Sequence, residues 1–152
     1  MSRVKMWLAV AIPSLLLPHQ AWAGLGHQVD MTSAEPGRMQ VRQHMITTTG
    51  SGALHRLSLA NGGEVREYTN AAGVVYALRW NGPGKPDLKT LLGPHYDTLQ
   101  ADNPISARHG LRRAPMVDRA DLKIFTGGHA GAFWGYAWLP QYVPAGFDPA
   151  AL

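Results

Sequence analysis

Residues 61–80 read NGGEVREYTNAAGVVYALRW, and this stretch decides the fold. Its two segments at residues 64–69 and 74–80 are rich in the valine, tyrosine and threonine that strands favour. Asn61-Gly62-Gly63 is a strong hairpin loop before the first segment, and residues 70–73 turn the chain into the second. The stretch therefore predicts consecutive antiparallel strands.

The register of these strands follows from a pairing of Thr69 with Val74 across the loop. Side chains alternate strictly along a strand, so this pairing collects a mostly apolar set on one face. The set comprises Val65, Glu67, Thr69, Val74, Tyr76, Leu78 and Trp80. This face is expected to meet the core, and Glu67 is its misfit, because an unpaired buried carboxylate is costly.

Strands are also expected on both sides of this stretch. A three-residue loop at 61–63 would place Leu57 and Leu59 of the preceding strand, residues 54–60, on the same core face. Residues 40–49 form a further strand. Near the C-terminus, residues 117–125 form one strand or a tight pair, Gly127-Gly128 a turn, and residues 129–139 a long strand.

A helical segment lies between these β regions. Apolar residues recur there at helical spacing: Leu88, Leu91, Leu92, Tyr96 and Leu99. Pro94 predicts either a kink or a division into two short helices. The predicted class is α+β: an antiparallel sheet of about five to six strands with this segment packed on one face. A small sandwich or half-barrel with the helix at one end is the alternative.

The first 23 residues have the composition of a cleavable secretory signal helix. Arg3 and Lys5 precede the apolar run MWLAVAIPSLLL at residues 6–17, and Ala21 and Ala23 form a cleavage site before Gly24. A membrane anchor is the alternative, but a span needs about 20 apolar residues and proline interrupts this run. The pattern predicts a periplasmic or secreted protein cut between Ala23 and Gly24.

The mature chain is expected to contain one domain. We expect a flexible N-terminal arm at residues 24–39, a single α+β domain at 40–140 and a coil tail at 141–152. The chain has no cysteine, which excludes disulfides and thiolate metal sites. No later segment is long and apolar enough to span a membrane.

The charge gives little reason to expect a nucleic-acid partner. Loss of Arg3 and Lys5 with the signal lowers the formal net charge from +4 to +2, which is 12 basic minus 10 acidic residues. The basic cluster at residues 108–113 lies between two prolines and is interpreted as a solvated loop. An anion or membrane-surface contact is its alternative.

Several segments, in this order, resemble a known bacterial family. They are 61–68 (NGGEVREY), 73–83 (GVVYALRWNGP), 86–88 (PDL), 91–93 (LLG), 127–129 (GGH), 132–133 (AF) and 137–140 (AWLP). The chain resembles the exported family catalogued as domain of unknown function 2844. The resemblance implies a small exported protein, and the family has no established activity, ligand or catalytic residue. Pro94 departs from the family's smoother helix, which puts a continuous helix in doubt.

The histidines offer weak candidates for chemistry. No pair has HxH or HExxH spacing, so no metal site or cofactor is expected, although His44 and His55 could meet across neighbouring strands. His129 follows two glycines, and Glu67 could be its acid–base partner. In the alternative, Glu67 is neutralised by Arg56 or Arg79. No G-x-S-x-G elbow or phosphate loop is present.

The last strand carries a stripe of aromatic residues, Trp134, Tyr136 and Trp138. If it is exposed, the rings would stack on sugars; if the helix covers it, they are core. Arg79 shares the less apolar sheet face with Arg66 and would lie opposite Glu64, as an anion site or a solvated charge.

These observations favour a non-catalytic binding or accessory module that contacts a protein or glycan of the cell envelope. One alternative is a small periplasmic hydrolase that uses His129 and Glu67. Another is a subunit or maturation factor of another exported protein.

Overall fold

The computed structural model describes residues 24–28, 40–104 and 114–152. Three expectations fall on residues outside these ranges. They concern the signal peptide at 1–23, most of the N-terminal arm and the basic cluster at 108–113.

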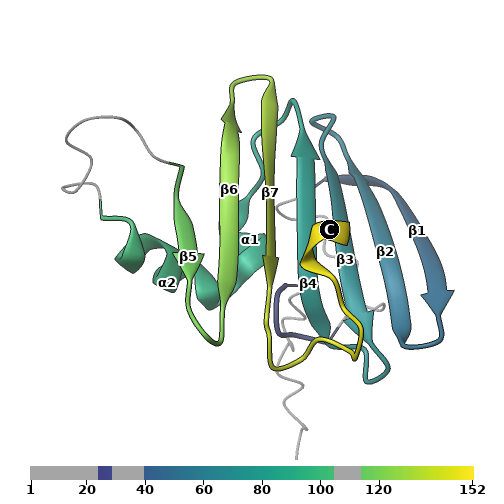
Figure 1. Cartoon of the computed structure of the whole chain (residues 1–152). Helices are drawn as coiled ribbons and strands as arrows, with labels where there is room; N and C mark the ends of the chain where they lie inside the picture. Colours follow the sequence, from purple (N-terminus) through teal and green to yellow (C-terminus); the bar gives the residue numbers. More distant parts are fainter. Residues whose placement is uncertain (1–23, 29–39, 105–113) are drawn as a thin grey trace, which may run out of the picture.

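The described chain forms one seven-stranded antiparallel sheet and two α-helices, which confirms the predicted α+β class (Figure 1). The spatial order of the strands is β1-β2-β3-β4-β7-β6-β5. Their bounds are β1 Val41–Thr49, β2 Gly52–Leu59, β3 Glu64–Asn70, β4 Val75–Gly82, β5 Met116–Asp118, β6 Lys123–His129 and β7 Ala132–Trp138. The count exceeds the expected five to six because residues 117–125 divide between β5 and β6.

The helical segment is divided in two, one of the two predicted outcomes. Helix α1 is Leu88–Leu92 and helix α2 is His95–Asp102. The Asp87 side chain caps α1 by accepting a hydrogen bond from the Thr90 amide at 3.2 Å. Gly93, at φ 53°, ends α1, and Pro94 then begins α2. Proline has no amide hydrogen to donate to the preceding turn, so the helix restarts here.

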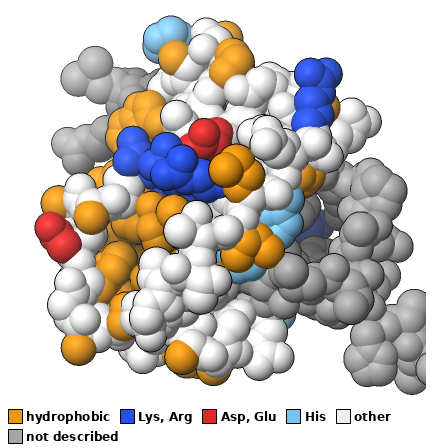
Figure 2. All heavy atoms as spheres, turned by 90° about the vertical axis from the view of Figure 1, so that its right-hand side faces the viewer, with side chains coloured by type: hydrophobic (Ala, Val, Ile, Leu, Met, Phe, Trp, Pro, Cys, Tyr) orange, Lys and Arg blue, Asp and Glu red, His pale blue; other side chains and the backbone are white. Residues whose placement is uncertain are grey.

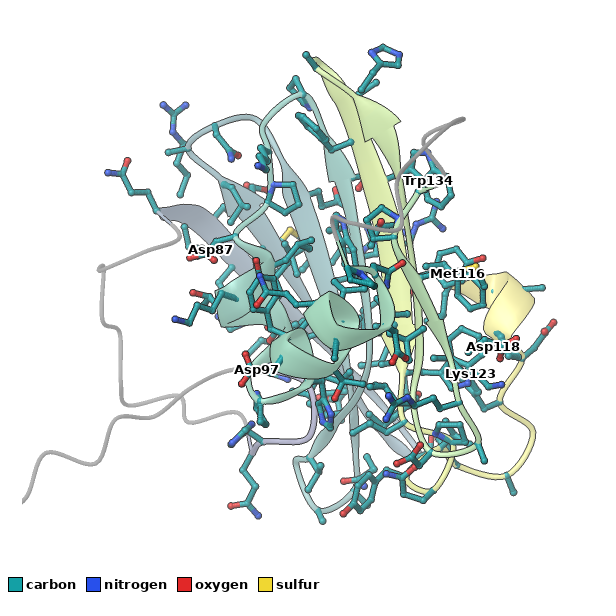
Figure 3. All side chains as sticks on the ribbon, turned by 90° about the vertical axis from the view of Figure 1, so that its left-hand side faces the viewer. Asp87, Asp97, Met116, Asp118, Lys123 and Trp134 are labelled. Carbon is teal, nitrogen blue, oxygen red and sulfur yellow. The ribbon has the colours of Figure 1, made fainter. Side chains whose placement is uncertain are left out.

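The sheet has two faces, which we name by what covers them. The helix-side face packs against α1, α2 and residues 24–28, and it holds most of the buried core (Figure 1). The tail-side face is partly covered by residues 140–152, which fold back over it and end in the short 3-10 helix η2, Pro149–Ala151. Figure 3 shows the two sides: Asp87 and Asp97 lie by the helices, and Trp134, Met116 and Lys123 lie opposite.

The pairing of β3 with β4 differs from the predicted register. Thr69 pairs with Val75 rather than Val74, and Tyr68 pairs with Ala77, which leaves Tyr76 as an extra residue in β4. Such a β-bulge turns the following side chains by one position. Val75 therefore joins the helix-side core, while Tyr76 lies in the tail-side cluster instead of the predicted core face.

Most of the predicted core face is confirmed: Val65, Leu78 and Trp80 lie in the helix-side core and Glu67 is buried, but Val74 is half-buried and lies outside that core. Leu57 pairs with Val65, and both are buried on the helix side with Leu59. On the opposite face the shifted register overturns one expected pair: Glu64 lies opposite Asn81, and Arg79 lies opposite Arg66.

The predicted turn at Gly127-Gly128 is wrong, because both glycines lie within β6 and the hairpin turns at residues 130–131. Gly127 is required by its neighbour. A Cβ there would come within 2.3 Å of Trp134 Cζ2, because the indole lies across this position. A glycine in a strand interior often marks such a close approach.

Residues 24–28, the first part of the expected flexible arm, pack into the core. Leu25 is fully buried, and its amide donates to the Leu91 carbonyl at 3.0 Å. The Gly26 amide donates a hydrogen bond to the Val75 carbonyl, and the Val75 amide donates one to the His27 carbonyl. Leu152 is also buried, so described residues on both sides of the range 40–140 contribute to the packing.

We predict that Leu25→Ala lowers the free energy of unfolding by about 2–5 kcal/mol, because it removes a fully buried side chain. Urea denaturation of the mature chain measures the change. Met116→Ala is the control, since Met116 is 45% exposed. Equal stability of the two variants would show that residues 24–28 do not contribute to the core.

Candidate functional site

An array of near-parallel aromatic rings occupies the tail-side face. Trp134, Tyr136 and Trp138 alternate along β7, and Phe125 of β6 lies opposite Tyr136. Neighbouring ring centroids are 5.2 to 6.3 Å apart, and the planes of neighbouring rings lie within 29° of one another. Sequence reasoning missed Phe125, although its place two residues before Gly127 on an alternating strand puts it on the Trp134 face.

The array is covered by the C-terminal tail at one end and is open at the other. The tail's Phe147 contacts the rings of Tyr76 and Trp138, with centroids 5.5 and 6.4 Å away. Trp134 is 47% exposed (Figure 3). The alternative in which the helix covers the stripe is therefore wrong, since α1 and α2 pack on the other face.

A row of arginines continues from the array across the same face. Arg56, Arg66 and Arg79 lie directly opposite one another on β2, β3 and β4, and Tyr136 lies opposite Arg79. Like charges in direct register destabilise a sheet. Figure 2 shows basic side chains gathered beside an acidic one on this part of the surface.

The row has limited compensation among the described residues. Arg66 donates to Glu64 at 2.6 Å, and Arg79 donates through Nη1 to the Leu152 backbone oxygen at 2.5 Å. Within the residues that the structure describes, Arg56 takes part in no ion pair. Among the described residues, Glu64 is therefore the side-chain carboxylate that is paired with this row of three guanidinium groups.

Glu67 is the acidic residue that the strand alternation placed among the apolar residues of the core face. It is only 2% exposed, and within the described chain its Oε1 atom has no hydrogen-bond partner. Burial raises the pKa of Glu67 to about 7. Arg56 and Arg79 cannot neutralise it, because they lie on the tail-side face, so that interpretation is wrong.

The structure does not bring His129 and Glu67 together. His129 is exposed at the end of β6, where its Nδ1 atom lies 2.9 Å from the Ala130 carbonyl. Glu67 is buried in β3, and strands β4 and β7 lie between the two. Adjacent strands are about 4.8 Å apart, so β3 and β6 are roughly 14 Å apart, and His129 lies further along β6 than Ile124, the residue in line with Glu67. Direct proton transfer requires hydrogen-bond reach.

His44 and His55 do meet, as their placement on neighbouring strands suggested. His44 Nε2 lies 3.0 Å from His55 Nδ1. Burial and the neighbouring His44 lower the pKa of His55. Glu67 lies directly opposite His55 in the adjacent strand. Among the described residues, however, no group of three or more such side chains is arranged to hold a metal ion.

An open hollow of about 320 Å³ lies on the helix side, where α1 meets α2. His27, Lys89 and Asp97 are among its lining residues. The charges in its wall are mixed, since Lys89 and Asp97 both line it. In the described part of the chain, no helix has the length and apolar character needed to cross a membrane.

We predict that Glu67→Gln stabilises the protein in a pH-dependent way. The carboxyl stays protonated in the folded state up to about pH 7, whereas its ordinary pKa is 4.5. The folded chain binds the extra proton, so its stability falls as pH rises from about 4.5 to about 7. The variant lacks this loss. Its free energy of unfolding should therefore exceed that of the wild type by about 3 kcal/mol above pH 7, and by little below pH 4.

Urea denaturation from pH 4 to pH 8 measures this difference. Glu64→Gln is the matched control on the same strand, because Glu64 is partly exposed and lies on the other face. A stability gain that does not vary with pH would show that the Glu67 carboxyl is not the titrating group.

Comparisons with known proteins place the chain in one family. None of the curated proteins and none of the solved structures compared with it matches. The model of the family described as "Protein of unknown function (DUF2844)" matches residues 21–152, which include every described element. The chain therefore belongs to this family, as its motifs predicted.

Proposed function

We propose that the protein is exported and acts as a non-catalytic binding module that holds an envelope glycan on its tail-side face. The observation that carries this proposal is the array of near-parallel rings ending in Trp134, whose indole is 47% exposed.

The chemistry of the face suits a sugar. One face of a pyranose presents C–H groups that pack on an aromatic ring, while its hydroxyls point outward to polar partners. The indole of Trp134 lies across Gly127, which has no side chain to lift it away from the sheet. The adjoining arginine row supplies hydrogen-bond donors for hydroxyl or carboxylate oxygens.

The tail's packing on part of the array favours a glycan over a protein. A stable protein interface buries about 800 Å² on each partner around an apolar centre. Here the tail already packs against Trp138 and Tyr76, and Arg79 lies opposite Tyr136 in the middle of the array. A single exposed ring is enough to stack on one sugar.

The burial of Leu25 agrees with the position of the predicted cleavage site. That site lies between Ala23 and Gly24, and Leu25 is fully buried. Cleavage there would keep Leu25 in the mature protein.

The export proposal predicts a mature protein that begins at Gly24. Expression of the full chain in a Gram-negative host, followed by fractionation and intact-mass measurement, would detect it outside the cytoplasm without residues 1–23. Replacing Ala21 and Ala23 by leucine should block cleavage, because the small residues of the site are lost. Recovery of the uncut chain in the cytoplasm would contradict export.

The glycan proposal predicts that Trp134→Ala weakens binding by about tenfold, the scale of one lost aromatic contact. Binding is measured by calorimetry against soluble peptidoglycan fragments and host exopolysaccharide. Tyr142→Ala is the matched control, because Tyr142 is an exposed aromatic residue outside the array.

Two outcomes would contradict the glycan proposal. One is the absence of binding to any glycan of the panel. The other is equal binding by Trp134→Ala and the control. If an envelope protein co-purifies with the wild type but not with Trp134→Ala, the face binds protein instead.

A further inference from the structure

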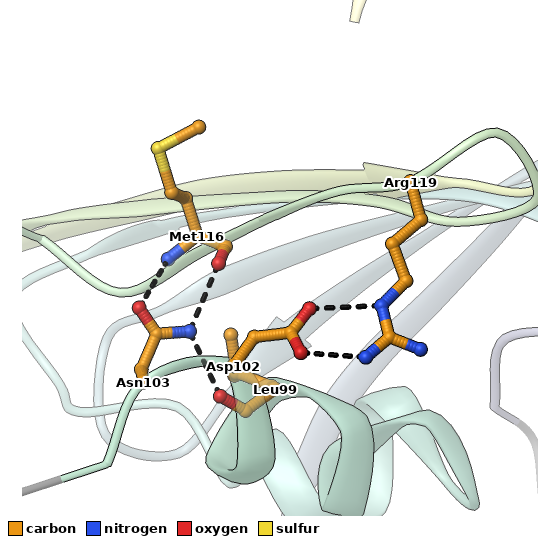
Figure 4. A network of polar contacts seen from close by, with 5 residues as sticks. All are labelled: Leu99, Asp102, Asn103, Met116 and Arg119. Atoms are coloured by element: carbon orange, nitrogen blue, oxygen red, sulfur yellow. Dashed lines mark hydrogen bonds and ion pairs between the residues drawn. The ribbon is translucent and has the colours of Figure 1, made fainter.

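The two edges of the sheet are finished differently. The β5 edge is three residues long and lies against helix α2 (Figure 4). The β1 edge is nine residues long, and all nine are exposed. A strand at a sheet edge presents unpaired amides and carbonyls that can pair with another strand.

Side chains block the β5 edge. Asn103 occupies both backbone groups of Met116: its Nδ2 donates to the Met116 carbonyl at 2.9 Å, and its Oδ1 accepts from the Met116 amide at 3.1 Å (Figure 4). Arg119 also binds Asp102 of α2 through two hydrogen bonds, of 2.9 and 2.6 Å. No neighbouring strand can reach Met116 without displacing Asn103.

In the part of the chain that the structure describes, the β1 edge has none of the usual protection beyond its first residues. A bulge interrupts the ladder between Val41 and Gln43, and the regular part runs from Gln43 to Thr49. This part contains no proline, lysine or acidic residue, and Met45 and Ile46 are 53% and 43% exposed. Natural sheets place charges, proline or bulges on such edges to prevent pairing.

We propose that β1 is a self-association edge, on which two copies of this chain pair antiparallel about a two-fold axis at Ile46. That register uses the whole regular segment from Gln43 to Thr49. It places Ile46 opposite Ile46 of the second copy, Met45 opposite Thr47, and His44 opposite Thr48.

This pairing is complementary to itself, which is what a symmetric dimer requires. A β-branched residue meets its own copy at the centre, and such cross-strand pairs are favourable. Arg42 lies beyond the regular segment, and the register puts no two like charges opposite each other. Each of the two exposed apolar side chains would gain a cross-strand neighbour on its own face of the sheet.

Oligomeric state is the first test. The mass of the mature chain, measured by sedimentation from about 1 μM to about 1 mM, should rise toward that of a dimer. In Ile46→Lys the two lysine charges would face each other across the two-fold axis. The association should therefore weaken by at least about tenfold. Met116→Lys is the matched control, an exposed residue on the blocked edge, and should change association by less than about twofold.

Disulfide formation tests the register, because the natural chain has no cysteine. In Ile46→Cys the two Cα atoms would be about 4.5–5.5 Å apart, within the range of a disulfide, so mild oxidation should give a covalent dimer. In Thr48→Cys the two sulfurs would be offset by four residues, about 13 Å along the strand, and should not join.

Three results would overturn the proposal. The first is a monomer at every concentration, with no more crosslinking of Ile46→Cys than of Thr48→Cys. The second is a dimer that survives Ile46→Lys, since its interface would lie elsewhere. The third is a monomer whose β1 amides are protected from hydrogen exchange, which would show that the chain's own residues 29–39 cover this edge.

Discussion

The structure depends on the pairing of β4 with β7. These strands are separated by about fifty residues in the chain, and their ladder joins the four N-terminal strands to the three C-terminal ones. Pairing of strands so distant in the sequence loses loop-closure entropy. Favourable contacts between the side chains of the two strands must offset this loss. Trp80, buried at 3% exposure, lies over Gly135 directly opposite it, where a Cβ would come within 2.2 Å of Trp80 Cζ2.

The same arrangement, an indole lying over a glycine of the neighbouring strand, recurs on the opposite face of the sheet. Trp134 of β7 lies over Gly127 of β6, as Trp80 lies over Gly135. On the helix-side face the arrangement buries an indole in the core, while on the tail-side face it keeps an indole close to the sheet and half exposed. The β4–β7 ladder also sets Arg79 beside Tyr136, and so joins the arginine row to the aromatic array. One long-range contact thus supports the core and assembles the proposed binding face.

Local patterns in the sequence predicted much of this fold. The Asn61-Gly62-Gly63 loop and strand alternation placed Leu57, Val65 and Glu67 on one core face, and all three are there. The spacing of leucines predicted the helical segment, and Pro94 its division. The burial of Glu67 was predictable because alternation is strict within a strand. Its lack of an arginine partner was not, because that depended on which face each arginine occupied.

The failures share a physical cause, which is that tertiary contacts decided what local chemistry left open. The bulge at Tyr76 moved one side chain to the other face, and no single residue signals a bulge. Gly127-Gly128 resembles a turn, but Gly127 has no side chain because an indole from the next strand occupies that space. Residues 24–28 resemble a loose arm, yet Leu25 fills the core beneath the end of α1.

The proposed edge and the proposed binding face have a geometric consequence together. When antiparallel edge strands pair about a two-fold axis, that axis is perpendicular to the sheet, so both copies present the same face to the same side. Two tail-side faces would then lie on one continuous sheet, each with its Trp134 and its arginine row. A repeating polymer could contact both, and linked contacts raise the overall affinity without any new interaction. β1 and β5 are the opposite edges of the sheet, and among the described residues β1 is exposed while Asn103 blocks β5, so each copy offers one edge for pairing and such growth stops at a pair.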